Sequence, residues 1–238
     1  MPLGHINLIF NYGAAYMHIE EGKEVVVPNA AIIGQITEAK HVVYGTQLDQ
    51  IGIALKPAGF LAVFHIAGEA INERILKVGD VDAALYEVYI RSRQVVDYEE
   101  RLQQLYNCVK TNIIFDEKYK RLRDMTTYIE CNCETLHIDS MAKSFGISVS
   151  TLERFFKKQV GLTPKAYGTI FKFRKNVEDE LRRKQIQNYY YDQSHLIKTT
   201  KKLSGKTFHE LEQVEKELTL QHILNNSADF LQYKYPLD

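Results

Sequence analysis

The stretch from Ile138 to Lys158 carries side chains whose order and spacing suit the recognition of DNA. Leu152, Phe155 and Phe156 recur at spacings of three and four, so on a helix they share one buried stripe. A guanidinium can donate two hydrogen bonds to guanine, and lysine ammonium groups pair with phosphates. The pattern therefore predicts a helix with one polar, mostly basic outer face: Ser150, Thr151, Glu153, Arg154, Lys157 and Lys158.

A shorter helix is expected directly before this one. Asp139 or Ser140 can cap it. Its inner face consists of three residues: Met141, Ala142 and Phe145. Gly146 supplies a left-handed turn, Ile147 enters the core, and Ser148 caps the second helix. A short helix, a glycine turn and a basic second helix form the arrangement that places a helix in the major groove. On spacing alone, an ordinary helical hairpin with solvated charges is an equal alternative.

The same stretch resembles the AraC-type (arabinose-regulator-like) family of transcription regulators. Its matching positions run from the turn glycine into a Gly-hydrophobic-Thr-Pro segment: Gly146, Ser148, Leu152, Arg154, Phe156, Lys157, Gly161, Leu162, Thr163 and Pro164. Tyr167, Phe171 and Arg174 continue the likeness, which covers about residues 130–215. The resemblance implies a sequence-specific regulator whose partner is double-stranded promoter DNA.

The resemblance also implies roles for the outward residues of the first motif. Ser150, Glu153 and Arg154 are expected at base edges. Arg154 can bind guanine O6 and N7 together, which is worth about 1–3 kcal/mol of discrimination. Glu153 can accept from cytosine N4, although balancing Lys157 at i+4 is an equal alternative. The expected phosphate contacts are Thr151, Lys157, Lys158 and Lys165.

A second signature, from Tyr190 to Leu196, resembles the second recognition helix of the family. It leads into a basic stretch and Gly205-Lys206-Thr207. The base contacts expected there are Gln193, Ser194 and Lys198, and the phosphate contacts are Lys201 and Lys202. The predicted recognition helices are thus 148–158 and 191–202.

This second unit departs from the family pattern. Residues 176–188 have room for about one polar helix, where the family fits a linker helix and the first helix of the motif. Tyr189 stands in place of the turn glycine, Thr200 in place of a core phenylalanine, and Phe208 in place of the closing proline. The departures leave an alternative open, in which the chain is a sensor or antagonist that acts by protein–protein association and binds DNA weakly.

The elements before the motif predict an α+β chain. Short apolar runs closed by turn residues indicate a β-rich sensing domain over residues 1–80, a small barrel or sandwich. The expected strands are 5–10, 24–27, 32–36, 41–44 and 50–55, with a helix near 59–70. Helical spacing then predicts helices near 81–93, 97–110 and 117–130. Residues 81–115 would form a helical connector, and 116–238 an all-helical DNA-binding domain.

The first domain resembles the β-rich N-terminal domain of some AraC-type regulators. The likeness lies in residues 4–13 and 52–59. In arabinose-type relatives such a domain binds a small effector and sometimes dimerises, so an effector and a homodimer are candidate partners. Because the chain opens almost inside a strand, we expect this domain to lack a first strand or two.

Charge is unevenly distributed along a chain whose formal net charge is zero. Residues 1–115 hold 9 basic and 13 acidic residues, whereas 141–208 hold 15 basic and 5 acidic ones. A basic segment on a neutral chain is the footprint expected where phosphates are bound. No apolar run reaches the roughly 18 residues of a membrane span, so no membrane partner is expected.

Residues for enzyme chemistry do not gather in the sequence. The histidines of the first half stand singly, without the spacing of metal ligands: His5, His18, His41 and His65. No phosphate-cradling glycine loop and no nucleophile motif occurs. An odd number of cysteines (Cys108, Cys131 and Cys133) and no signal-peptide pattern predict a reducing cytoplasm. We therefore expect no enzyme, no cofactor and no metal.

Overall fold

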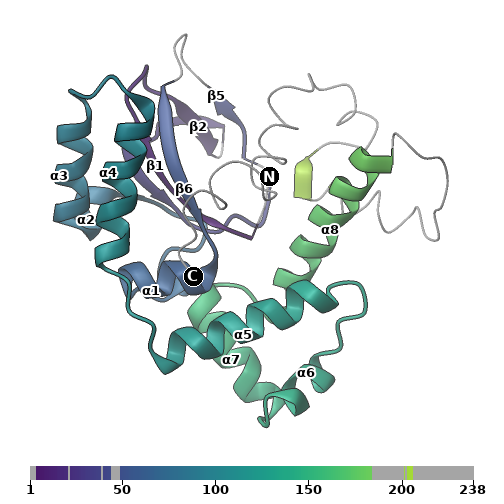
Figure 1. The fold of residues 1–238 in the computed structure, drawn as a ribbon. Helices are drawn as coiled ribbons and strands as arrows, with labels where there is room; N and C mark the ends of the chain where they lie inside the picture. Colours follow the sequence, from purple (N-terminus) through teal and green to yellow (C-terminus); the bar gives the residue numbers. More distant parts are fainter. Residues whose placement is uncertain are drawn as a thin grey trace.

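The computed structural model describes residues 4–20, 22–38, 40–43, 49–183, 201 and 203–205. Within this part, six strands come before the first helix, a seventh strand follows that helix, and only helices come after it, which confirms the predicted α+β class (Figure 1). The strands are β1 Ile6–Asn11, β2 Met17–Glu20, β3 Lys23–Val26, β4 Ala30–Ile33, β5 Val42–Val43, β6 Gln50–Leu55 and β7 Ile75–Lys77. The helices are α1 Pro57–Phe64, the 3-10 turn η1 Gly68–Ala70, α2 Val78–Val81, α3 Ala83–Ser92, α4 Tyr98–Thr111, α5 Glu117–Asn132, α6 Ile138–Ser144, α7 Val149–Val160 and α8 Pro164–Arg183.

The strands form two antiparallel sheets. Four strands are ordered β6-β1-β4-β7, and three are ordered β3-β2-β5. Alternation along β1 sends Ile6, Leu8 and Phe10 to one face, where all three are fully buried. On the opposite face, Ala31 packs with Tyr16 and Val27 in a smaller cluster.

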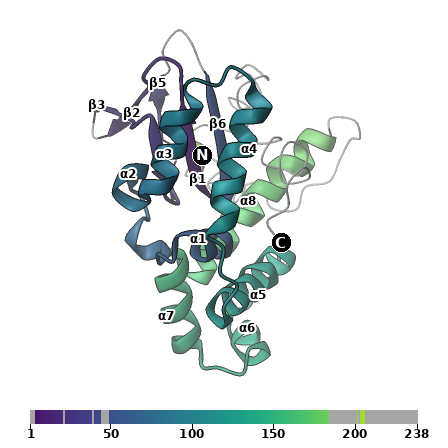
Figure 2. The ribbon, with the colours of Figure 1, turned by 60° about the vertical axis from the view of Figure 1, so that its left-hand side comes forward.

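The main apolar core lies between the four-stranded sheet and helices α1, α3 and α4. Phe10 meets Tyr89 of α3 edge-on, with 5.2 Å between ring centroids. Asp82 caps α3 by accepting from Leu85 N, and Asp97 caps α4 by accepting from Glu100 N. These are the two helices that the sequence predicted near 81–93 and 97–110, and they pack on the sheet of their own chain (Figure 2).

A second apolar core lies among α1, α5, α6, α7 and α8. Ala58, Leu61 and Ala62 of α1 enter this core, whereas Phe60 and Phe64 of the same helix enter the first. All but one of the eight residues of α1 are buried. This short helix therefore belongs to both cores.

The helix predicted near 59–70 is divided. Pro57 occupies the first turn of α1, as a residue without an amide hydrogen prefers. His65 has a φ of 56°, and this left-handed conformation ends the helix. The chain then forms η1 after a short extended segment. Strands β2 and β7 were not predicted, and β4 ends at Ile33 rather than near residue 36.

Because α1 belongs to both cores, truncating it should weaken both together. We expect Leu61→Ala to lower the free energy of unfolding by about 2–5 kcal/mol, with one cooperative transition retained. Urea unfolding followed by far-UV circular dichroism and tyrosine fluorescence measures this. Val96→Ala is the control, because Val96 is 93% exposed and its truncation should change stability by less than about 0.5 kcal/mol. Two separate transitions, with only one affected, would contradict the shared helix.

Candidate nucleic-acid interface

Helices α6 and α7 are joined by a tight turn at Gly146. Gly146 has a φ of +63°, and the amide of Ile147 donates to Ala142 O at 3.1 Å. The Ser148 hydroxyl accepts from Thr151 N at 3.2 Å, so the predicted cap of the second helix is confirmed. The predicted cap of the first helix is wrong. That helix begins at Ile138 after His137, so Asp139 and Ser140 lie inside its first turn.

The buried stripe of α7 contains Leu152 and Phe156, both with no exposed surface. Phe155, which the spacing placed in the same stripe, is only partly buried. The guanidinium of Arg121, on α5, lies 5.2 Å from the centre of the Phe155 ring. A cation over an aromatic face is a favourable contact, and here it brings an exposed arginine to the side of α7.

The outer face of α7 is open to solvent along its length. Five of the predicted DNA-contacting residues of this helix are exposed: Ser150, Glu153, Arg154, Lys157 and Lys158. Thr151 is partly buried and accepts from the Ser148 hydroxyl at 2.9 Å. Glu153 and Lys157 form no ion pair, so the interpretation of Glu153 as a partner of Lys157 is not supported. Lys165 is exposed near the start of α8.

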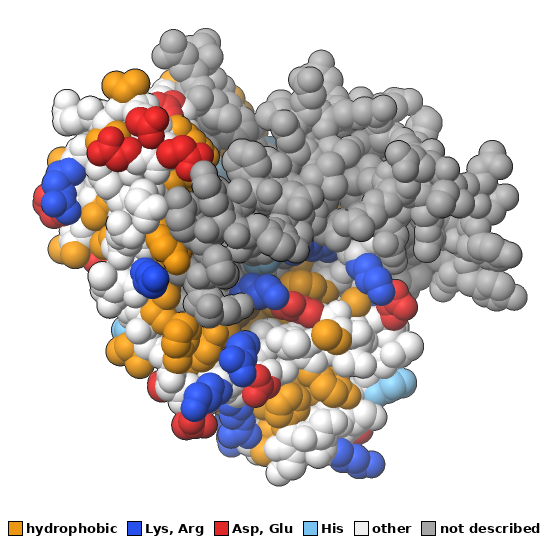
Figure 3. All heavy atoms as spheres, viewed as in Figure 1, with side chains coloured by type: hydrophobic (Ala, Val, Ile, Leu, Met, Phe, Trp, Pro, Cys, Tyr) orange, Lys and Arg blue, Asp and Glu red, His pale blue; other side chains and the backbone are white. Residues whose placement is uncertain are grey.

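Further basic side chains on α5 were not assigned from the sequence. Figure 3 shows Lys and Arg side chains over α5, interspersed with Asp and Glu. Lys120 pairs with Glu117 at 2.6 Å, and Arg123 pairs with Asp124 at 3.0 Å. Arg121 makes no such pair within the described residues. The run of alternate basic residues from 118 to 123 was the available signal.

The segment from Gly161 to Tyr167, which follows α7 in the chain, packs against the buried side of that helix. Gly161 has a φ of +86° and ends α7 by donating to Lys157 O at 2.8 Å. Tyr167 has no exposed surface and meets Phe156 edge-on at 5.5 Å. Its hydroxyl donates to Glu130 Oε1 at 3.1 Å, and burial raises its pKa well above the usual value.

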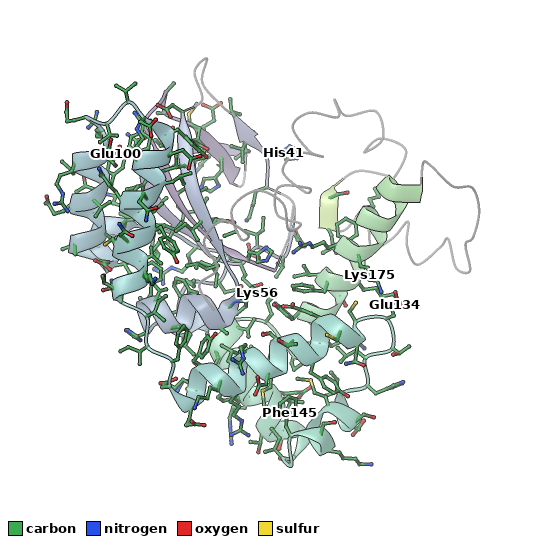
Figure 4. All side chains as sticks on the ribbon, in the orientation of Figure 1. His41, Lys56, Glu100, Glu134, Phe145 and Lys175 are labelled. Carbon is green, nitrogen blue, oxygen red and sulfur yellow. The ribbon has the colours of Figure 1, made fainter. Side chains whose placement is uncertain are left out.

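The same carboxylate also receives a cation from the first half of the chain. Lys56 Nζ lies 2.8 Å from Glu130 Oε2, so Glu130 joins the sheet region to α8 through one ion pair and one hydrogen bond. Farther along α8, Lys175 Nζ lies 2.7 Å from Glu134 Oε1 (Figure 4). These contacts hold α8 beside α5.

The second predicted motif falls mainly outside the described residues. Gln193, Ser194, Lys198 and Lys202 lie there, so their roles stay predictions. Lys201 is described, and it is exposed in a helical turn that ends at Gly205. The polar segment predicted as one helix over 176–188 begins as a continuation of α8, which runs unbroken from Pro164 to Arg183.

The C-terminal end of α7 is held by the first half of the chain. Gln35 Nε2 donates to Val160 O at 3.1 Å in a buried hydrogen bond. Gly68 of η1 lies against the same backbone, and a Cβ added there would stand 2.5 Å from Val160 C and 2.6 Å from Gln159 O. Asn72 packs against Gly161 from the same turn. The second helix of the motif is therefore docked on the sheet region.

Polar atoms at this junction are incompletely paired. Gln35 Oε1, Asn72 Oδ1 and Gln159 Oε1 are buried without a hydrogen-bond partner among the described residues. Buried acceptors are usually paired, and an unpaired one costs about 1–3 kcal/mol. The junction is thus held by close packing and by the bond from Gln35 to Val160.

A side chain at residue 68 should disturb the junction because it would meet main-chain atoms. We expect Gly68→Ala to lower the free energy of unfolding by about 1–3 kcal/mol. Gly59→Ala is the matched control, since a Cβ there meets only Leu55 Cδ2 at 3.9 Å and the helix gains an alanine. Urea titrations of the two variants measure the difference. Equal stability would mean that the contact at Gly68 is not close.

His5 lies buried near the cations of Lys56 and Arg174. Burial, followed by the charges of Arg174 and Lys56, lowers the pKa of His5 from 6.5 to about 3. On acidification, His5 therefore becomes protonated at a higher pH in the unfolded chain than in the folded chain. The stabilisation is complete above pH 6.5 and is lost as the pH falls toward about 3.

Replacing His5 should remove this acid sensitivity. We expect His5→Phe to show a shallower fall in unfolding free energy than the wild type between pH 6.5 and about 3. Urea denaturation at a series of pH values gives both slopes. Parallel curves for the two proteins would show that His5 titrates alike in the folded and unfolded states.

Within the described part of the chain, no three His, Cys, Asp or Glu side chains gather as a metal-binding group. Cys108, Cys131 and Cys133 are all free thiols. None of the described helices is long and apolar enough to cross a membrane.

Comparisons with known proteins find a similarity among solved structures alone. No protein-family model matches the chain, and no curated protein matches it. Among solved structures, the chain is similar to ToxT from Vibrio cholerae O395, with a TM-score of 0.47 and 8% sequence identity. The match covers 89% of each chain. A likeness at that level says nothing about a site or about function.

Proposed function

We propose that this protein is a DNA-binding transcription regulator of AraC type, which reads major-groove bases with α7. The observation that carries the proposal is the α6–turn–α7 unit, whose second helix turns a polar, mostly basic face to solvent. The Gly146 turn and the Ser148 cap give this unit the geometry of a helix-turn-helix. The residues that resemble the AraC family lie in the same unit.

Arg154 is the main candidate for base recognition in this proposal. It is exposed in the second turn of α7 and has no carboxylate partner within the described residues. Its guanidinium is therefore free to bind guanine through two donors. Ser150 and Glu153 flank it as further base contacts, and Lys157 and Lys158 hold phosphates, which position the helix without specifying sequence.

The docked position of α7 gives the first half of the chain a role in this function. Since Gln35 and Gly68 hold the end of α7, a change in the sheet region alters how the reading face is presented. The outer face of α7 is exposed from Ser150 to Lys158, so recognition in this proposal rests on the first motif. The second motif, over 191–202, would extend the footprint along the DNA.

The test is fluorescence anisotropy with the DNA upstream of the protein's own gene and a scrambled duplex, across a salt series. Six to ten phosphate contacts predict that affinity falls by about 10³ to 10⁵ between 50 and 200 mM salt. Arg154→Ala should remove most of the preference for the native duplex. Arg154→Lys is the matched control, because it keeps the charge and loses the two-donor geometry, so it should also lose preference.

Lys157→Ala separates phosphate contacts from base reading. It should weaken binding to both duplexes alike and reduce the salt slope by about 0.9. If both duplexes bind equally weakly and Arg154→Ala matches the wild type, α7 does not read bases. That result would favour the alternative of a sensor or antagonist that acts by protein–protein association.

A further inference from the structure

A hollow of about 230 Å³ opens between α3 and the ends of strands β4 and β7. Figure 2 shows α2 and α3 on a different part of the molecule from α7. The hollow is lined from both sides, by Asn29 and Lys77 of the strand region and by Tyr86, Tyr89, Ile90 and Arg93 of α3 and its end. It lies outside the candidate nucleic-acid interface.

Tyr89 lies behind the hollow and is fixed in place by its neighbours. Tyr89 is 4% exposed, and its hydroxyl donates to Asn11 O at 3.1 Å. Its ring lies 5.2 Å from Phe10 and 5.9 Å from Tyr86, so it is braced on two sides. Tyr86 and Ile90 are each more than a third exposed. Their exposed parts give the hollow an apolar patch within a lining that is otherwise mainly polar.

The rim of the hollow carries two positive charges that no carboxylate of the described residues neutralises. Lys77 and Arg93 are exposed, and neither has a carboxylate within ion-pair distance among the described residues. No Asp or Glu lines the hollow, although acidic residues outnumber basic ones over residues 1–115. Burial raises the pKa of Tyr89, and the positive charge of Arg93 opposes that rise, which places this charge near Tyr89.

We propose that this hollow binds a small organic anion with an aromatic or flat apolar body. The flat body would lie against the exposed sides of Tyr86 and Ile90, and a carboxylate, sulfonate or phosphate group would lie between Lys77 and Arg93. Two cations from different elements select an anionic group, and the apolar patch selects a flat body, so neither feature alone suffices. Pockets of this kind join apolar walls to a few placed polar groups.

Isothermal titration calorimetry with 1-naphthalenesulfonate tests the site on the full chain at low ionic strength. Saturable binding at one site is expected. Arg93→Gln and Lys77→Gln should each weaken it by about fivefold, and the double variant by about 25-fold. Arg91→Gln is the matched control, because Arg91 lies on the same helix and does not line the hollow. Its affinity should equal that of the wild type.

Two further ligands separate the contributions of charge and ring. Naphthalene-1-methanol, which lacks the charge, and inorganic sulfate, which lacks the ring, should both bind much more weakly than the sulfonate. Tyr86→Ala should weaken the sulfonate and leave the protein folded, because Tyr86 is 39% exposed. The proposal is overturned if the sulfonate does not bind, if the neutral alcohol binds equally well, or if Arg91→Gln weakens binding as much as Arg93→Gln.

Discussion

The fold depends on the burial of one short helix on two sides. Helix α1 spans only eight residues, and its composition is almost wholly apolar. Phe60 and Phe64 pack against the sheet, while Leu61 and Ala62 pack against α5 and α7. Since burying each large apolar side chain contributes roughly 1.5–3 kcal/mol, both cores lose stability if this helix moves. The positions of α5 and α7 relative to the sheet follow from it.

Polar contacts add to the position of the helical unit that the packing of α1 determines. Glu130 joins Lys56 to Tyr167, and Gln35 reaches Val160 across 125 residues of sequence. The backbone amide of Ile114 donates to Ala62 O at 3.0 Å, which ties the start of the helical half to the end of α1. Together these bonds orient a helical unit whose attachment is chiefly apolar.

The sequence was most informative where structure is local. The turn at Gly146, the cap at Ser148 and the stripe of Leu152 and Phe156 each depend on residues within a few positions of one another. Contacts between distant segments were not predictable in this way. Strand β7 has only three residues and exists because it pairs with β4, and the cation that packs on Phe155 is Arg121 from another helix. Gln35 and Gly68 contact residues that are far away in the sequence, so their role at the end of α7 could not be predicted from the residues around them.

Within the described part of the chain, several cations on α5 and α8 are paired with carboxylates, whereas those on α7 are not. Lys120, Arg123 and Lys175 each have a carboxylate partner on α5 or directly after it. The lysines and the arginine of α7 have none among the described residues, so their field extends into solvent. Within this part of the chain, they and Arg121 together place unpaired positive charge on α7 and the adjoining side of α5.

The contact at Gly68 has a consequence for how this protein can change during evolution. Main-chain atoms of residues 159 and 160 form the surface that Gly68 meets, so their side chains are not part of that contact. Mutations at those two positions leave it in place as long as the helix persists. Almost any mutation at residue 68 would instead insert a side chain where there is no room. Sequence drift at residue 68 is therefore restricted by the helix backbone, while Val160 is restricted separately by the burial of its own side chain in the second core.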